Sequence, residues 1–163
     1  MKKIILFGSL FAFLGFSAYA QEVAVADSVT IEEMTKFAKV EVMTADFVEG
    51  KNKELVEMIT NNEVIGGGAR YNEIKAAWGD ETKLAAINVT PEEKVAYQGI
   101  LDFMTSMKEV VVGYKTDLIK NDSILGIATY NKVNKAIKED PAMKEKMDLL
   151  INSLKVKDDG AGI

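Results

Sequence analysis

The chain has 163 residues, of which 20 are Lys or Arg and 25 are Asp or Glu, giving a net charge of −5 at pH 7. It contains no cysteine and no histidine. Disulfides, an acylated-cysteine anchor, thiolate or imidazole zinc sites and histidine-based catalytic triads are therefore excluded. An acidic chain without a basic cluster also argues against nucleic acid and anionic membranes as partners. We expect a single domain held together by packing, with no cofactor and no metal.

Residues 1–20 have the pattern of a secretory signal peptide. Two lysines precede an apolar run from Ile4 to Phe16, and the small-residue sequence Ala-Tyr-Ala ends at Ala20. An uncleaved membrane anchor is the alternative, but the run is shorter than the roughly 20 residues that a spanning helix needs. The pattern predicts export to the periplasm or beyond, cleavage after Ala20, and no membrane span in the mature chain.

Three helix starts follow along the chain. Thr30 and Thr90 each stand three residues before a glutamate, which is the pattern of a capping box, and a proline follows Thr90. Asp140 with Pro141 marks a third start, with Asp140 as the capping residue. The glutamate pairs behind both threonines suit the positive end of a helix dipole, and we favour that role over acid–base catalysis. These signals predict an all-helical protein.

Two long segments repeat apolar residues every three or four positions, as an amphipathic helix does. The first stripe comprises Met34, Phe37, Val40, Met43, Phe47, Leu55 and Ile59. The second comprises Ala96, Ile100, Phe103, Met104, Met107, Val111, Tyr114 and Leu118. Three consecutive valines at 110–112 would also suit a short strand, but no turn signal brackets them. Both segments are predicted to be helical.

The sequence also repeats itself, first with a shift of 60 residues and then of 59. Seven of sixteen positions are identical between residues 62–77 and 121–136, where unrelated segments would share about one. We expect one domain over 28–151, a helical bundle of two tandem repeats at about 29–88 and 89–151. Each repeat would hold a long amphipathic helix and a shorter helical pair, and would bury its apolar stripe against the other. Residues 152–163 are expected to form a flexible tail.

Glycines separate the long segment from the shorter pair in each repeat. Gly66–Gly68 and Gly126 are expected to supply backbone freedom where the long helices stop. A phosphate-binding loop is the alternative for the three glycines, but no Lys-Ser/Thr follows them and no strand precedes them. Asp158-Asp159-Gly160 resembles the start of a calcium loop, but the remaining ligands are missing.

The dipeptides Tyr71-Asn72 and Tyr130-Asn131 occupy equivalent places in the two repeats. They could form two symmetry-related polar sites that offer a phenol and an amide to a partner. Alternatively, the rings pack between helices while the amides satisfy backbone groups near a helix start. We favour packing, because both repeats keep the pair while the neighbouring residues differ.

The order of paired glutamates, a long helix, a Gly turn, Tyr-Asn-x-(Ile/Val)-x-x-Ala and Asp-Pro-x-Met resembles the 4168 family of domains of unknown function. That family comprises secreted or envelope proteins of bacteria. The similarity covers about residues 28–151 and is strongest at 130–143. Family members commonly have Gly-Leu before the Tyr motif, where this chain has Gly67-Gly68 and Gly126-Ile127. The resemblance implies an exported helical domain and supplies no established activity, so it carries no catalytic residues onto this sequence. The motif residues, which we expect to be structural, are Tyr71, Asn72, Tyr130, Asn131, Asp140 and Pro141.

Two functions remain open, and neither is enzymatic. The first is an envelope protein whose surface or groove engages another envelope protein, or unfolded clients in the manner of a holdase. The second is a binder of a small apolar ligand between the two repeats, with Met and Tyr side chains lining the cavity.

Overall fold

The computed structural model describes residues 28–159, so the expected signal peptide lies outside the described residues. This part of the chain forms six helices and no strand, which confirms the all-helical prediction. The helices are α1 (Ile31–Thr60), α2 (Gly68–Ala77), α3 (Glu81–Ala86), α4 (Pro91–Lys120), α5 (Ile127–Glu139) and α6 (Pro141–Asp159). The valines at 110–112 lie inside α4, as the absence of flanking turn signals indicated.

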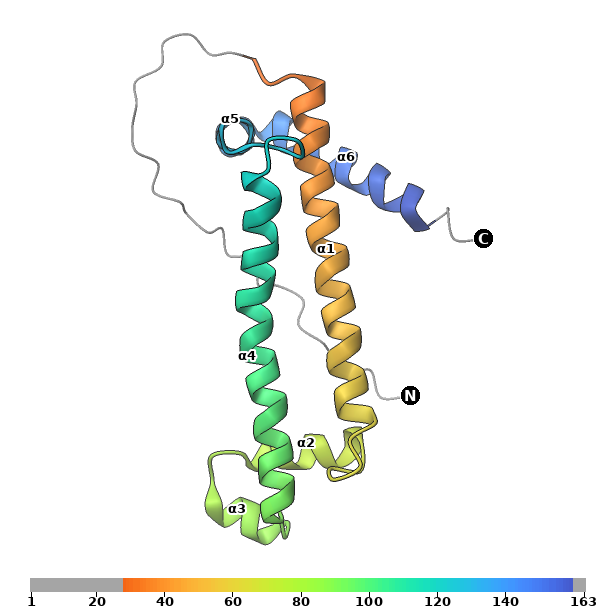
Figure 1. The fold of residues 1–163 in the computed structure, drawn as a ribbon, viewed down its shortest axis with the longest axis vertical. Coiled ribbons are helices and arrows are strands. Elements are labelled where there is room, and N and C mark those ends of the chain that lie inside the picture. Colours follow the sequence, from red (N-terminus) through yellow and green to blue (C-terminus); the bar gives the residue numbers. More distant parts are fainter. Residues whose placement is uncertain (1–27, 160–163) are drawn as a thin grey trace.

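The two long helices form an antiparallel hairpin with a pair of shorter helices at each end (Figure 1). Helices α1 and α4 are 30 residues each and pack along one another. Helices α2 and α3 lie where α1 finishes and α4 begins, which we call the α2–α3 end. Helices α5 and α6 lie at the opposite, α5–α6 end, where α6 crosses and contacts α1.

The predicted helix starts are confirmed in atomic detail. Thr30 accepts a hydrogen bond from the backbone N–H of Glu33 at 3.2 Å, and the Glu33 carboxylate accepts one from the Thr30 N–H at 2.7 Å. Thr90 and Glu93 repeat this capping box at 3.1 and 2.8 Å. Each box satisfies two backbone donors that a helix start would otherwise leave unpaired.

The apolar residues form two separate core clusters, one at each end of the hairpin. The cluster at the α5–α6 end includes Phe37, Val40, Leu118, Val133 and Met147. The cluster at the α2–α3 end includes Leu55, Ile65, Ile74, Leu84 and Ile100. Both clusters draw on α1 and on α4, because each long helix reaches both ends. Phe47 of α1 stacks on Tyr114 of α4, which packs against the cluster at the α5–α6 end, with the ring centroids 4.2 Å apart.

Two features differ from the prediction. Helix α6 continues to Asp159, so residues 152–159 are helical where a tail was expected. The long helices end at Thr60 and Lys120, several residues before the glycines. Gly67 (φ +96°) and Gly126 (φ +83°) instead stand directly before α2 and α5, where the chain must turn into the next helix.

Candidate functional site

The two motif tyrosines pack at opposite ends of the hairpin. Tyr71 is 8% exposed, and its ring centroid lies 5.4 Å from that of Tyr97 on α4. Tyr130 is half-buried and stacks on Phe37 of α1 at 5.5 Å. Phe37 and Tyr97 are themselves 60 residues apart, so both ends use the same pairing of a motif tyrosine with an aromatic of a long helix.

Burial also raises the pKa of these phenols and so favours their neutral form. It raises the pKa of Tyr71 and of Tyr130, and the negative charge of Glu41 adds to the effect at Tyr130. Burial, with a smaller contribution from Tyr71, raises the pKa of Tyr97 to about 12. These groups therefore stay neutral near pH 7 and do not supply a general base.

The motif asparagines face solvent. Asn72 and Asn131 are both exposed, and neither side chain makes a hydrogen bond within the part of the chain that the structure describes. The backbone N–H of each motif tyrosine is bonded to the glycine that precedes its helix. Tyr71 N–H donates to the Gly67 carbonyl at 3.1 Å, and Tyr130 N–H donates to the Gly126 carbonyl at 2.9 Å. The expected amide–backbone bonds are thus absent from residues 28–159.

The remaining motif residues start α6. Asp140 accepts a hydrogen bond from the Ala142 N–H at 2.9 Å, and Pro141 is the first residue of the helix. Both are exposed. They belong to the α5–α6 end with Tyr130, whereas Tyr71 belongs to the α2–α3 end. The motif residues therefore do not converge on a common site.

The most buried carboxylate, Glu93, is held by Arg70. Its Oε1 accepts from Arg70 Nε at 2.6 Å and its Oε2 from Arg70 Nη2 at 3.0 Å, while Arg70 Nη1 reaches Glu73 at 3.0 Å. The Arg70 hydrogen bonds, together with that from Thr90, lower the pKa of Glu93 against the opposing effect of burial. Glu93 therefore stays ionised and serves as a structural anchor.

Glu33 has the same role at the other end. Its two carboxylate oxygens accept from Lys132 Nζ on α5 at 2.9 and 3.0 Å. The backbone hydrogen bond from Thr30 is the largest cause of its lowered pKa, followed by that from Lys132. Among residues 28–159, no group of three or more acidic side chains is arranged to hold a metal ion. The first glutamate of each pair, Glu32 or Glu92, is exposed in the first turn of its helix.

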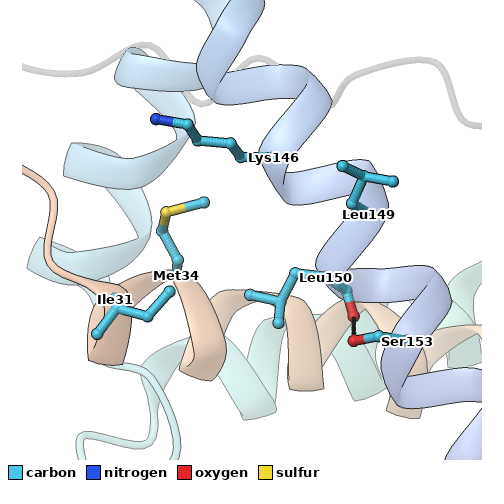
Figure 2. Close-up of a pocket in the computed structure, with 6 residues that line it drawn as sticks. All are labelled: Ile31, Met34, Lys146, Leu149, Leu150 and Ser153. Atoms are coloured by element: carbon cyan, nitrogen blue, oxygen red, sulfur yellow. Dashed lines mark hydrogen bonds between the residues drawn. The ribbon is translucent and has the colours of Figure 1, made fainter.

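An apolar groove lies where α6 crosses the start of α1 (Figure 2). Ile31 and Met34 come from α1, and the α6 residues that line it are Lys146, Leu149, Leu150 and Ser153. The groove has a volume of about 370 Å³ and is widely open to solvent. The Ser153 hydroxyl donates to the carbonyl of Leu150 at 2.8 Å, so it is already engaged.

The groove combines exposed apolar side chains with one cation. Ile31 is 73% exposed and Leu149 is 64% exposed, whereas Met34 beneath them is buried. Lys146 is exposed and makes no ion pair with the described residues. This groove was not predicted from the sequence, because it depends on the crossing of α6 over α1, whose groove-lining residues lie more than 100 positions apart in the sequence. The apolar spacing of Leu150, Ile151 and Leu154 indicates only that the last helix continues, and not where it packs.

The fold and these contacts define an all-helical protein, a long antiparallel hairpin with a helical pair at each end. No helix within residues 28–159 is long and apolar enough to cross a membrane. No family model, no curated protein and no solved structure matches the chain. The resemblance to the 4168 family of domains of unknown function stays a prediction.

Proposed function

We propose that the chain is an exported, non-enzymatic helical envelope protein that binds other protein chains through exposed apolar side chains, in the manner of a holdase. The observation that carries this proposal is the open groove between α1 and α6, where Ile31 and Leu149 present most of their surface to water. Isolated exposed apolar residues are ordinary on protein surfaces, but apolar side chains gathered in one groove are typical of an interaction site.

A tandem repeat is the second part of this proposal. The two long helices have equal length and the same capping box, and a positive-φ glycine precedes the helix that carries each tyrosine. The aromatic pairs Phe37–Tyr130 and Tyr97–Tyr71 support it as well. The repeats would differ in their last helix, since α3 has 6 residues and α6 has 19.

Export rests on the first 20 residues of the sequence. Two lysines, an apolar run and Ala-Tyr-Ala give the order of features that signal peptidases recognise. Expression of the full chain in a bacterial host should give a product outside the cytoplasm whose intact mass starts at Gln21. Changing Ala20→Lys should block cleavage. A cytoplasmic product that retains residues 1–20 would contradict the export proposal.

An aggregation assay tests the holdase activity. A chemically denatured enzyme is diluted with and without the mature chain, and light scattering is followed. Stoichiometric amounts should suppress scattering, and Leu149→Ser should reduce that effect. Val95→Ser is a matched control, because Val95 is 74% exposed on α4 and does not line the groove. If the mature chain leaves scattering unchanged, the holdase proposal fails.

A small apolar ligand is the alternative occupant, because the groove is bounded by α1 and α6, which belong to different proposed repeats. Small-molecule sites usually bury most of the ligand surface, however, and this groove is widely open to solvent. Screening by thermal shift with apolar ligands would test the alternative. A ligand that raises the unfolding temperature of the parent chain but not of Leu149→Ser would favour it over protein binding.

The non-enzymatic assignment has its own test. It is supported by the absence of histidine and cysteine from the sequence and by the structural engagement of Glu33 and Glu93. Turnover of peptidoglycan or peptide substrates that is lost on changing a specific Asp, Glu or Tyr would contradict it.

A further inference from the structure

The first turns of the two long helices make different contacts with the last helix at their end of the hairpin. At the α2–α3 end, Lys94 in the first turn of α4 pairs with Glu81 of α3, Nζ to Oε2, at 2.6 Å. The residue 60 positions earlier is Met34, in the first turn of α1 at the α5–α6 end. There the long helix offers an apolar side chain, and α6 continues across it. At this position the α2–α3 end has an ion pair, whereas the α5–α6 end has an apolar groove.

The extra length of α6 builds this groove. Leu149, Leu150 and Ser153 lie in the part of α6 that exceeds the six residues of its counterpart α3. Figure 2 shows the Leu150 side chain directed toward α1, while the Leu149 side chain lies farther from α1, at the edge of the groove. Leu150 helps to attach α6 to the core cluster at this end, but Leu149 remains mostly exposed. Covering Leu149 and Ile31 would remove apolar surface from water, which favours binding in proportion to the area buried.

A single positive charge borders the apolar walls. Lys146 has no ion pair among the described residues, and none of the six residues that line the groove is acidic. Two acidic residues flank Lys146 on α6: Glu145 is exposed and does not line the groove, and Asp148 is engaged by Lys144 at 2.6 Å. A carboxylate docked beside Lys146 would therefore meet a cation that has no ion pair among the described residues, next to apolar surface where attraction is stronger than in bulk water.

We propose, on the basis of the proposed protein-binding function, that this groove takes an amphipathic helical segment of a partner protein. Two apolar side chains one turn apart would pack against Ile31, Met34 and Leu149, and a carboxylate on the same helix face would pair with Lys146. An open groove suits helix docking, in which side chains spaced by three or four residues act as anchors. The charge of Lys146 selects an acidic segment over a neutral or basic one.

Two labelled synthetic peptides test the proposal. Both form an amphipathic helix with two leucines one turn apart, and they differ only in carrying Glu or Gln one turn further on. Fluorescence anisotropy is measured with the mature chain. The Glu peptide should bind about threefold more tightly than the Gln peptide, as expected for a solvent-exposed ion pair. Leu149→Ser should weaken both peptides about tenfold or more.

Substitutions at exposed positions separate the two contributions. Lys146→Ala should remove the preference for Glu, so that the two peptides bind with equal affinity. Lys108→Ala is its control, because Lys108 is an exposed lysine in the middle of α4 that makes no ion pair among the described residues. Val95→Ser is the control for Leu149→Ser. Equal binding of the two peptides, or a preference that survives Lys146→Ala, would overturn the carboxylate assignment.

The outcome distinguishes this proposal from the broader one. If neither peptide binds while the chain still suppresses aggregation, the groove assignment fails and the holdase proposal stands. If both assays fail, the proposed function fails as well. If dodecanoate binds in a Lys146-dependent manner and neither peptide does, the groove is a small-amphiphile site and the peptide assignment is overturned. Circular dichroism of every variant checks that the helical fold is kept.

Discussion

Arg70 of α2 donates two hydrogen bonds to Glu93 of α4, from Nε at 2.6 Å and from Nη2 at 3.0 Å. The same carboxylate accepts the Thr90 N–H and so closes the capping box of α4. One side chain therefore both starts a long helix and attaches a short helix to it. Glu33 does the same at the other end through Thr30 and Lys132.

Removing the Glu93 carboxylate should destabilise the packing of α2 against α4 at the α2–α3 end. Glu93→Ala deletes the reciprocal capping bond and leaves Arg70 without its main partner, so we expect unfolding to become easier by about 1–3 kcal/mol. Urea denaturation followed by circular dichroism measures the change. Glu92→Ala is the matched control, because Glu92 is exposed in the same turn and should change stability by less than about 0.5 kcal/mol. Equal effects of the two variants would contradict the anchoring role.

Acid should destabilise the fold through the same two glutamates. The pKa values of Glu33 and Glu93 lie below the ordinary value of 4.5 in the folded chain. A depressed folded pKa contributes stability that is present above the unfolded pKa and is lost as the pH falls through the folded value. Urea midpoints should therefore fall as the pH drops below about 4.5.

The pH experiment has an internal control. The chain contains no histidine, so its stability should be nearly flat between about pH 6 and pH 8. The double variant Glu33→Gln with Glu93→Gln should be less stable at neutral pH and should lose less stability on acidification. Parallel curves for parent and variant would show that other carboxylates dominate the acid response.

The sequence predicted those features that depend on neighbouring residues. The capping boxes at Thr30 and Thr90 and the start at Asp140 are local patterns, since donor and acceptor lie within three residues. The length of α6 was not predictable in this way. Leu150 and Leu154 pack against the cluster that contains Phe37 of α1, and that contact depends on residues more than 100 positions away in the sequence. The groove arises from the same crossing of helices, so the apolar spacing at the end of the chain could indicate that α6 continues, but not that it crosses α1 to form a groove.

The asparagines of the two Tyr-Asn motifs should tolerate substitution without loss of stability. Asn72→Ala and Asn131→Ala change exposed side chains without hydrogen bonds in the described structure, so each should shift stability by less than about 0.5 kcal/mol. Both asparagines could instead bind a partner, in which case the variants would keep their stability and lose suppression of aggregation. Marked destabilisation by either change would mean that the amide has a structural partner after all.

The core residues two positions after each of these asparagines should be far less tolerant of substitution. Ile74 and Val133 are both fully buried, one in each core cluster. Ile74→Ala should cost about 2–5 kcal/mol, and Val133→Ala should cost less because it removes fewer methyl groups. Urea midpoints measure both. If only one of the two were destabilising, the two clusters would not contribute comparably to a single cooperative fold.

Gly67 should resist substitution where its neighbour Gly68 does not. Gly67 has φ +96° and ψ −171° directly before α2, a region that residues with a Cβ rarely adopt, so Gly67→Ala should cost about 1–3 kcal/mol. Gly68 opens α2, and a Cβ there would meet no atom within 4 Å. Gly68→Ala should therefore be neutral or stabilising by up to about 1 kcal/mol, since alanine restricts the unfolded chain. Equal responses would show that the turn into α2 does not depend on the positive φ.

The same comparison applies at the other end of the hairpin. Gly126 has φ +83° before α5, and a Cβ there would lie 2.9 Å from Oδ1 of Asp122. Gly126→Ala therefore meets the backbone strain of Gly67→Ala and must also turn the Asp122 side chain aside. The variant Gly126→Ala with Asp122→Ala removes that steric contact but keeps the strain. Its urea midpoint should recover only partly, and full recovery would place the whole cost in the side-chain contact rather than in the backbone.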